Sequence, residues 1–186
     1  MKKIFIILFS VIISINYLFG QEQKYKEIND TELKLYKDLI QTLKDTTFIV
    51  YPLIEAPISS PLLNIQELTE YDFSSKQFKE PSITETFLIK DNNYFKVICP
   101  DSINSFKNHK ENNVLTSDSF LSAIKQHYGK SSVCYLSKAI FSKDKKYAVA
   151  EYFIFRGKLF GGGATVLMKK AKDKWVIIKD LISSLN

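Results

Sequence analysis

Arginine and histidine are scarce in this chain of 186 residues. Arg156 is the single arginine, whereas bidentate contacts with phosphate and guanine depend on that residue type. The two histidines, His109 and His127, lie far apart and lack a ligand-spaced partner, which argues against a dedicated zinc site. The sequence also shows no Ser–His–Asp grouping and no nucleotide-binding loop. We therefore assign no catalytic residue, and we expect no metal, no cofactor and no nucleic-acid partner.

Cysteine is nearly absent as well, because Cys99 and Cys134 are the only two. Both lie in apolar runs typical of strands, where buried thiols are common. A disulfide between them is the alternative, and it requires Cα atoms about 4.4–6.8 Å apart. The sequence leaves both states open. Neither cysteine has a histidine or a basic neighbour that would activate a nucleophilic thiol.

The first twenty residues have the pattern of a secretory signal peptide. Lys2 and Lys3 precede an apolar run over residues 4–15, and Gly20 supplies a small residue before Gln21. A retained membrane anchor is the alternative, but it needs about 20 apolar residues. We therefore expect cleavage near Gln21 and an exported protein, periplasmic or secreted, with no stable membrane span after processing. Its partner would be an unknown small ligand or an envelope protein.

Residues 21–186 are expected to form one domain. Removal of the two leading lysines lowers the formal net charge from +6 to +4. A solvated lysine surface explains that modest charge, with a polyanion-binding face as the alternative.

Proline and glycine divide the remaining chain into two parts. All five prolines lie within residues 52–100, and every glycine after Gly20 follows them. Helices are expected over residues 27–45, capped by one of residues 29–31, and over residues 117–128, ended by Gly129. In the first helix Glu32 lies in the first turn, and Leu35, Leu39 and Leu43 form an apolar stripe that predicts contact with the core. Between them we expect a strand at 47–55, a short helix within 61–73, and a hairpin over 84–99 that turns at 91–93.

Residues 132–184 predict four antiparallel strands joined by lysine-rich turns. The glycines at 161–163 fall inside the third strand, where they would form a bulge, or else they form a loop. Both faces of the second strand are apolar, and the small Ala148 and Ala150 predict a helix packed close to one of them. The fold class is α+β, with helices packed on a long, curved antiparallel sheet.

Three residues of this sheet are candidates for a pocket. Glu151 is a carboxylate among apolar neighbours, Asp180 holds a similar place on the last strand, and Tyr152 lies beside Glu151. An unpaired buried charge is costly, so each carboxylate should be exposed, paired with a lysine or functional. Trp175 opens the last strand. We predict that it lies in the core, on the same face as Ile177 and Leu181, with an exposed stacking platform as the alternative.

Residues 139–178 resemble the C-terminal half of a group of uncharacterised exported bacterial proteins. The shared pattern is an AIFSKDKK strand and turn, an apolar strand, a glycine cluster, a lysine turn and a Trp-led strand. Relatives in that group often carry cysteines near the glycine cluster, where this chain has Leu159 and Phe160. The resemblance therefore implies no metal or disulfide at that point.

The order of elements is also similar, at the level of the fold, to the NTF2-like cone. That likeness implies a ligand held within the curve of the sheet, although a fold does not fix a function. Three functions remain open from the sequence. The first is a non-catalytic domain that binds a small ligand or a protein. The second is an enzyme of unrecognised type that uses Glu151, Tyr152 or Asp180, and the third is an envelope-associated structural protein without a pocket.

Overall fold

The computed structural model describes residues 25–43, 47–54, 65–74, 76–79, 87–90, 92–99, 118–157 and 160–185. The signal peptide expected at residues 1–20 lies outside this part. Within it, no helix is long and apolar enough to cross a membrane. The described elements are β1 (Lys26–Glu27), α2 (Asp30–Thr42), β2 (Phe48–Val50), β3 (Leu53–Ile54), α3 (Ile65–Leu68), η1 (Thr69–Tyr71), α4 (Lys76–Lys79), β4 (Phe87–Leu88), α6 (Asp118–Tyr128), β5 (Ser132–Leu136), β6 (Ile140–Phe141), β7 (Tyr147–Phe155), β8 (Gly161–Ala171) and β9 (Lys174–Leu185).

The main sheet has six strands in the order β2-β5-β7-β8-β9, with β6 also paired to β7. Strands β5 to β9 run antiparallel, as expected, and the α+β class is confirmed. The sheet as a whole is mixed, because β2, which lies outside the four strands expected to run antiparallel, pairs with β5 in parallel. More than 80 residues separate the two strands along the chain, well above the dozen or so that a parallel crossover requires.

The hairpin expected over residues 84–99 does not form. Strand β4 pairs instead with β1 and β3, and Val97 makes an isolated parallel bridge to Val50. Asn92 explains the change of direction, because its side-chain oxygen accepts hydrogen bonds from the backbone N–H groups of Tyr94 and Phe95. This local turn redirects the chain toward β2.

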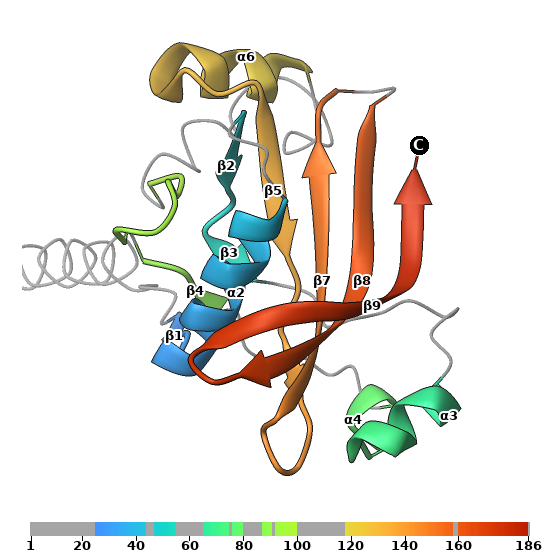
Figure 1. Cartoon of the computed structure of the whole chain (residues 1–186). Coiled ribbons are helices and arrows are strands. Elements are labelled where there is room, and N and C mark those ends of the chain that lie inside the picture. Colours follow the sequence, from blue (N-terminus) through green and yellow to red (C-terminus); the bar gives the residue numbers. More distant parts are fainter. Residues whose placement is uncertain are drawn as a thin grey trace, which may run out of the picture.

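Helix α2 begins after Asn29, one of the three N-cap residues that the sequence offered. The Asn29 side chain accepts a hydrogen bond from the backbone N–H of Glu32, at 3.0 Å, and its amide donates to the Glu32 carboxylate. The leucines of the predicted stripe face inward, with Leu35 and Leu39 fully buried. Figure 1 shows α2 lying across one face of the sheet, with the β8–β9 hairpin bent past its lower end. That face is therefore the concave one.

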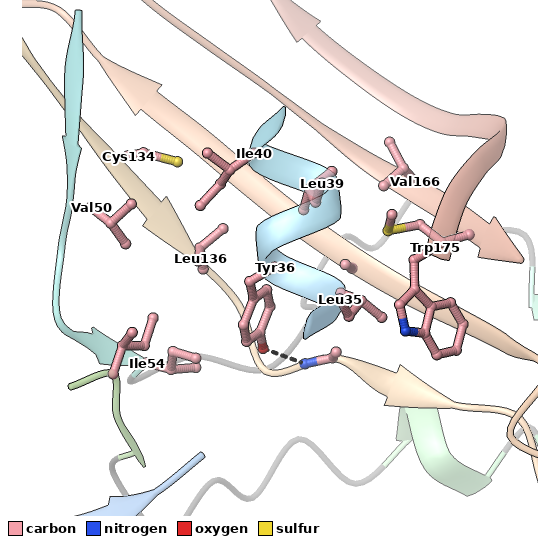
Figure 2. Close-up of a cluster of buried hydrophobic side chains, with 14 of the residues drawn as sticks. Leu35, Tyr36, Leu39, Ile40, Val50, Ile54, Cys134, Leu136, Val166 and Trp175 are labelled. Carbon is pink, nitrogen blue, oxygen red and sulfur yellow. Dashed lines mark hydrogen bonds between the residues drawn. The ribbon is translucent and has the colours of Figure 1, made fainter. Parts of the chain in front are cut away.

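The core between α2 and the concave face draws on strands from both ends of the sheet (Figure 2). Ala148 and Ala150 are fully buried there, which confirms that small side chains on β7 admit a closely packed helix. Trp175 is 3% exposed in the same cluster, and its ring lies 5.7 Å from that of Phe141. The core position of Trp175 is confirmed, and the exposed stacking platform is wrong.

The face shared by Trp175 does not extend to Leu181, contrary to expectation. Ile177 packs in the α2 cluster with Trp175, but Leu181 packs against a second cluster around Val149 and Leu167. Two register shifts between β8 and β9 explain the difference, because each inserts one extra residue into β9. An extra residue in a strand changes which side chains share a face downstream.

Polar side chains fasten α2 to the sheet at two points. The buried hydroxyl of Tyr36 donates to the carbonyl of Ser137 at 2.8 Å and accepts from the N–H of Ala139 at 3.1 Å. These are backbone groups between β5 and β6, where the first long strand expected from the sequence is split. At the other end of the sheet, the Asp38 carboxylate accepts a hydrogen bond from the backbone N–H of Trp175 at 2.7 Å.

A third fastening is an ion pair between Lys138 and the buried Glu32 carboxylate. Glu32 is 1% exposed, and the Lys138 ammonium also lies 3.8 Å from the centre of the Phe87 ring. One Glu32 oxygen, Oε1, is buried without a hydrogen-bond partner in the described part of the chain. Lys138 therefore satisfies one oxygen of the Glu32 carboxylate, Oε2, whereas Oε1 has no partner among the described residues.

Replacement of Trp175 by alanine should lower the free energy of unfolding by about 3–5 kcal/mol, because a buried aromatic ring leaves a cavity. Urea denaturation followed by circular dichroism measures this without the tryptophan signal. Tyr94→Ala is the control, since Tyr94 is 51% exposed. Equal stability of Trp175→Ala and wild type would contradict the core role.

Lys138→Met should destabilise the protein by about 3 kcal/mol, because it leaves the Glu32 carboxylate buried without its cation. Breaking a buried ion pair usually costs about 3–5 kcal/mol. We expect the low end, because the Lys138 side chain is 25% exposed and water already screens part of the interaction. The double variant Glu32→Gln/Lys138→Met should recover much of that loss, as the buried charge is then gone. A single variant no less stable than the double one would show that the ion pair is irrelevant to the fold.

Candidate functional site

The three sequence candidates do not lie on one face of the sheet. Successive side chains of β7 alternate, and Ala150 and Tyr152 point to the concave face that α2 covers. Glu151 points to the opposite face. Asp180 is paired with Val166, which belongs to the α2 cluster, so Asp180 lies on the concave face with Tyr152. Strand β8 separates the two carboxylates, and their opposite orientations do not favour a Glu151–Asp180 catalytic pair.

The backbone of Glu151 links β7 to the residue that follows β5. It is half-buried, and its backbone carbonyl accepts a hydrogen bond from the N–H of Ser137 at 3.0 Å. Its own backbone N–H donates to the Ser137 hydroxyl at 3.1 Å. Ser137 thus joins β7 to the break between β5 and β6 that Tyr36 spans from the other side.

Tyr152 is the centre of the candidate site. It is half-buried and packs against the margin of the α2 cluster, whereas Ala148 and Ala150 on the same face are completely covered. Burial raises the pKa of the Tyr152 phenol, and the negative charge of Asp180 raises it further, followed by Cys134. The phenol is therefore held in its protonated form, as a hydrogen-bond donor beside an exposed carboxylate.

The surface beside Tyr152 is built from small residues. Tyr152 pairs with Ala164 across the β7–β8 ladder, and Gly163 and Gly162 precede Ala164. A Cβ on Gly163 would lie 2.2 Å from the carbonyl oxygen of Tyr152, so only glycine allows the two backbones to approach this closely. The glycine cluster therefore determines where Tyr152 sits.

The glycines lie within a strand, as the first sequence interpretation had it, but they do not form the bulge. Gly161 to Gly163 pair in regular register with β7, and the register shifts lie further along β8, between residues 165 and 168. Gly161 instead provides room for an aromatic ring, because a Cβ there would lie 2.6 Å from Cζ of Phe153. Packing against a ring, rather than strand bending, thus explains this glycine.

The cysteines are not joined by a disulfide in the described part of the chain. Cys134 is fully buried in the α2 cluster, near Tyr152, and Figure 2 shows its sulfur beside Ile40. Cys99, by contrast, is exposed, so the expectation of two buried thiols is wrong for that residue. Its run of apolar neighbours is interrupted by the exposed Lys96, and the chain leaves the sheet after the bridge at Val97.

The sequence did not predict the polar contacts that the buried residues of α2 make with the sheet. Glu32 was interpreted only as an acid of the first turn, and Asp38 and Tyr36 were not singled out. The spacing of Asn29 and Glu32 is the one signal that could have identified the contact between their side chains. Among the described residues, no cluster of three or more acidic, histidine or cysteine side chains could hold a metal ion.

Comparisons with known proteins give no match. No protein-family model matches the chain, and no curated protein and no solved structure is significantly similar to it.

Replacement of Asp180 by asparagine should lower the pKa of Tyr152, because it removes the negative charge that disfavours the phenolate. The pKa of Tyr152 is higher in the folded protein than the value of about 10 in the unfolded chain. Tyr152 therefore contributes to the free energy of unfolding below about pH 10, and this contribution is lost as the pH rises through the pKa of the folded state. NMR of ring-labelled tyrosine, assigned with Tyr152→Phe, follows the titration. Asp173→Asn is the control, since the Asp173 side chain is 98% exposed in the β8–β9 turn. An unchanged Tyr152 titration in Asp180→Asn would refute the electrostatic contact.

Proposed function

We propose that residues 21–186 form an exported, non-catalytic binding domain whose ligand occupies the concave face around Tyr152. The observation that carries this proposal is the half-buried Tyr152 phenol, which lies at the margin of the α2 core on the same face as the exposed Asp180. Tyrosine combines a large apolar ring with a polar hydroxyl and is enriched at recognition surfaces for that reason. The resemblance to exported proteins and to the NTF2-like cone supports the same assignment.

The chemistry of the site favours a small ligand with an apolar body and a cationic or hydrogen-bond-donating group. Ala164 and the Tyr152 ring offer flat apolar surface beside small residues. Asp180 offers a carboxylate on the same face, and a cation beside it would satisfy that charge. An anionic ligand would meet repulsion from Asp180, whose negative charge acts on Tyr152.

The enzyme alternative has less support. It uses Glu151, Tyr152 or Asp180 as a general acid or base, and the two carboxylates point to opposite faces of the sheet, so they do not act on one ligand together. Tyr152 remains as a hydrogen-bond donor, but its raised pKa keeps the phenol protonated near neutral pH, so little phenolate is present to act as a base. Binding without chemistry requires only the groups that lie on the concave face.

Three matched probes test the proposal by NMR on the protein that begins at Gln21: benzylamine, benzyl alcohol and benzoate. Each carries the same ring, and the charge changes from positive through neutral to negative. We expect benzylamine to shift the backbone amides of Tyr152, Ala164 and Asp180 most, and benzoate least. Asp180→Asn should abolish the preference for the cation, and Tyr152→Ala should weaken all three probes.

Asp173→Asn is the control for a general change in charge, and it should leave the three titrations unchanged. If no probe shifts residues on the concave face, the binding proposal fails and the structural-protein alternative gains support. If benzoate is preferred, a ligand site exists, but the assignment of Asp180 as its charged group is wrong.

A further inference from the structure

The positive charge of the protein is concentrated at two neighbouring turns. The turn before β7 carries Lys143, Lys145 and Lys146, and the β8–β9 hairpin carries four more lysines, at 169, 170, 172 and 174. All seven are exposed. A backbone hydrogen bond of 2.8 Å from Lys170 N–H to the Lys146 carbonyl joins the two turns. We call these seven lysines, together with the neighbouring Asp144 and Asp173, the hairpin patch.

The hairpin patch accounts for the whole net charge of residues 21–186. Seven lysines and two aspartates give it a formal charge of +5, whereas residues 21–186 sum to +4. The rest of these residues therefore carries a formal charge of −1. Within the patch, Lys146 pairs with Asp144 at 3.1 Å, and the charge of +5 already counts that aspartate. Two exposed pairs of 3.9 Å, Lys34–Asp173 and Lys143–Asp72, join the patch to residues outside it and change its charge little. Such an uneven distribution creates a local positive potential instead of a uniformly solvated surface.

Exposed aliphatic side chains adjoin these lysines on β9. Val176 is 40% exposed and lies opposite Lys169 in the β8–β9 register, and Ile178 is 43% exposed two residues further on. The Lys169 ammonium lies 5.8 Å from the centre of the Tyr147 ring, on the neighbouring strand. Lysines interleaved with exposed apolar side chains fit an interface that is charged at its surface and apolar beneath.

We propose that the hairpin patch binds the surface of an anionic lipid bilayer. Lysine is a strongly hydrated point charge that suits a diffuse layer of phosphate headgroups, whereas discrete phosphate sites favour the bidentate fork of arginine. The hairpin patch contains no arginine. On a bilayer, Val176 and Ile178 would enter the interfacial layer beside the lysines. With a soluble polyanion, these two aliphatic side chains would stay in water. This inference is independent of the ligand proposed at Tyr152.

Vesicle co-sedimentation tests the proposal with the protein that begins at Gln21. We expect binding to vesicles made of equal parts phosphatidylglycerol and phosphatidylcholine, and none to pure phosphatidylcholine. Added salt should weaken the binding, since it screens the lysines. The triple variant Lys170→Gln/Lys172→Gln/Lys174→Gln should bind roughly a hundredfold more weakly, at about 1 kcal/mol for each lysine near an anionic surface.

The matched control is Lys26→Gln/Lys96→Gln/Lys125→Gln, which removes the same charge from exposed lysines outside the hairpin patch. It should bind as wild type does. If both triple variants lose the same amount of vesicle binding, the binding depends on the net charge of the protein and not on the hairpin patch, and the proposal is wrong. Circular dichroism and thermal unfolding of each variant establish that its fold is intact.

A second variant separates a bilayer from a soluble polyanion. Val176→Ser/Ile178→Ser should weaken binding to phosphatidylglycerol vesicles and leave binding to soluble polyphosphate unchanged. If this variant binds vesicles as tightly as wild type, or if vesicles fail to bind while polyphosphate binds through the same lysines, the assignment to a lipid surface is wrong.

Discussion

The hydroxyl of Tyr36 fills the gap between β5 and β6, and much of the fold depends on it. A strand that breaks inside a sheet leaves backbone groups without partners, and burying them unpaired is costly. Tyr36 supplies a donor and an acceptor to the two sides of that break from a fully buried position on α2. Burial, with a contribution from Glu32, raises the pKa of this phenol, so it keeps the proton that it donates. The helix and the sheet thereby complete each other's hydrogen bonds.

The same contacts, with one from Asp38, hold α2 in its place on the concave face. Tyr36 and Glu32 hold the first half of α2 against the strand break, and Asp38 connects the helix to the start of β9 through Trp175. Ala148 and Ala150 are therefore completely covered, while Tyr152, further along the same strand, remains half-buried. The candidate site is the part of the concave face that the helix does not reach.

Sequence patterns identified the elements with strong periodicity and missed the contacts between distant segments. The leucine stripe of α2, the alanines of β7 and the tryptophan of β9 were interpreted correctly, because each pattern reflects burial on one face. The parallel pairing of β2 and the division of the β5–β6 strand were not predictable, since both depend on partners about 80 or more residues away. Among the candidate residues, Tyr152 and Asp180 share a face and Glu151 does not. The register shifts that move Leu181 to the other face leave no local mark in the sequence.

Strand β9 is the outermost strand of the described sheet, and it is twelve residues long. An open edge of that length offers backbone donors and acceptors to any other extended chain, and copies of the protein would be prone to stack through it. The two extra residues that β9 carries relative to β8 interrupt the regular spacing of those groups. The lysines at its beginning add repulsion between copies. The irregular register of this strand thus makes the outer edge of the described sheet a poorer template for a further strand than a regular edge of the same length would be.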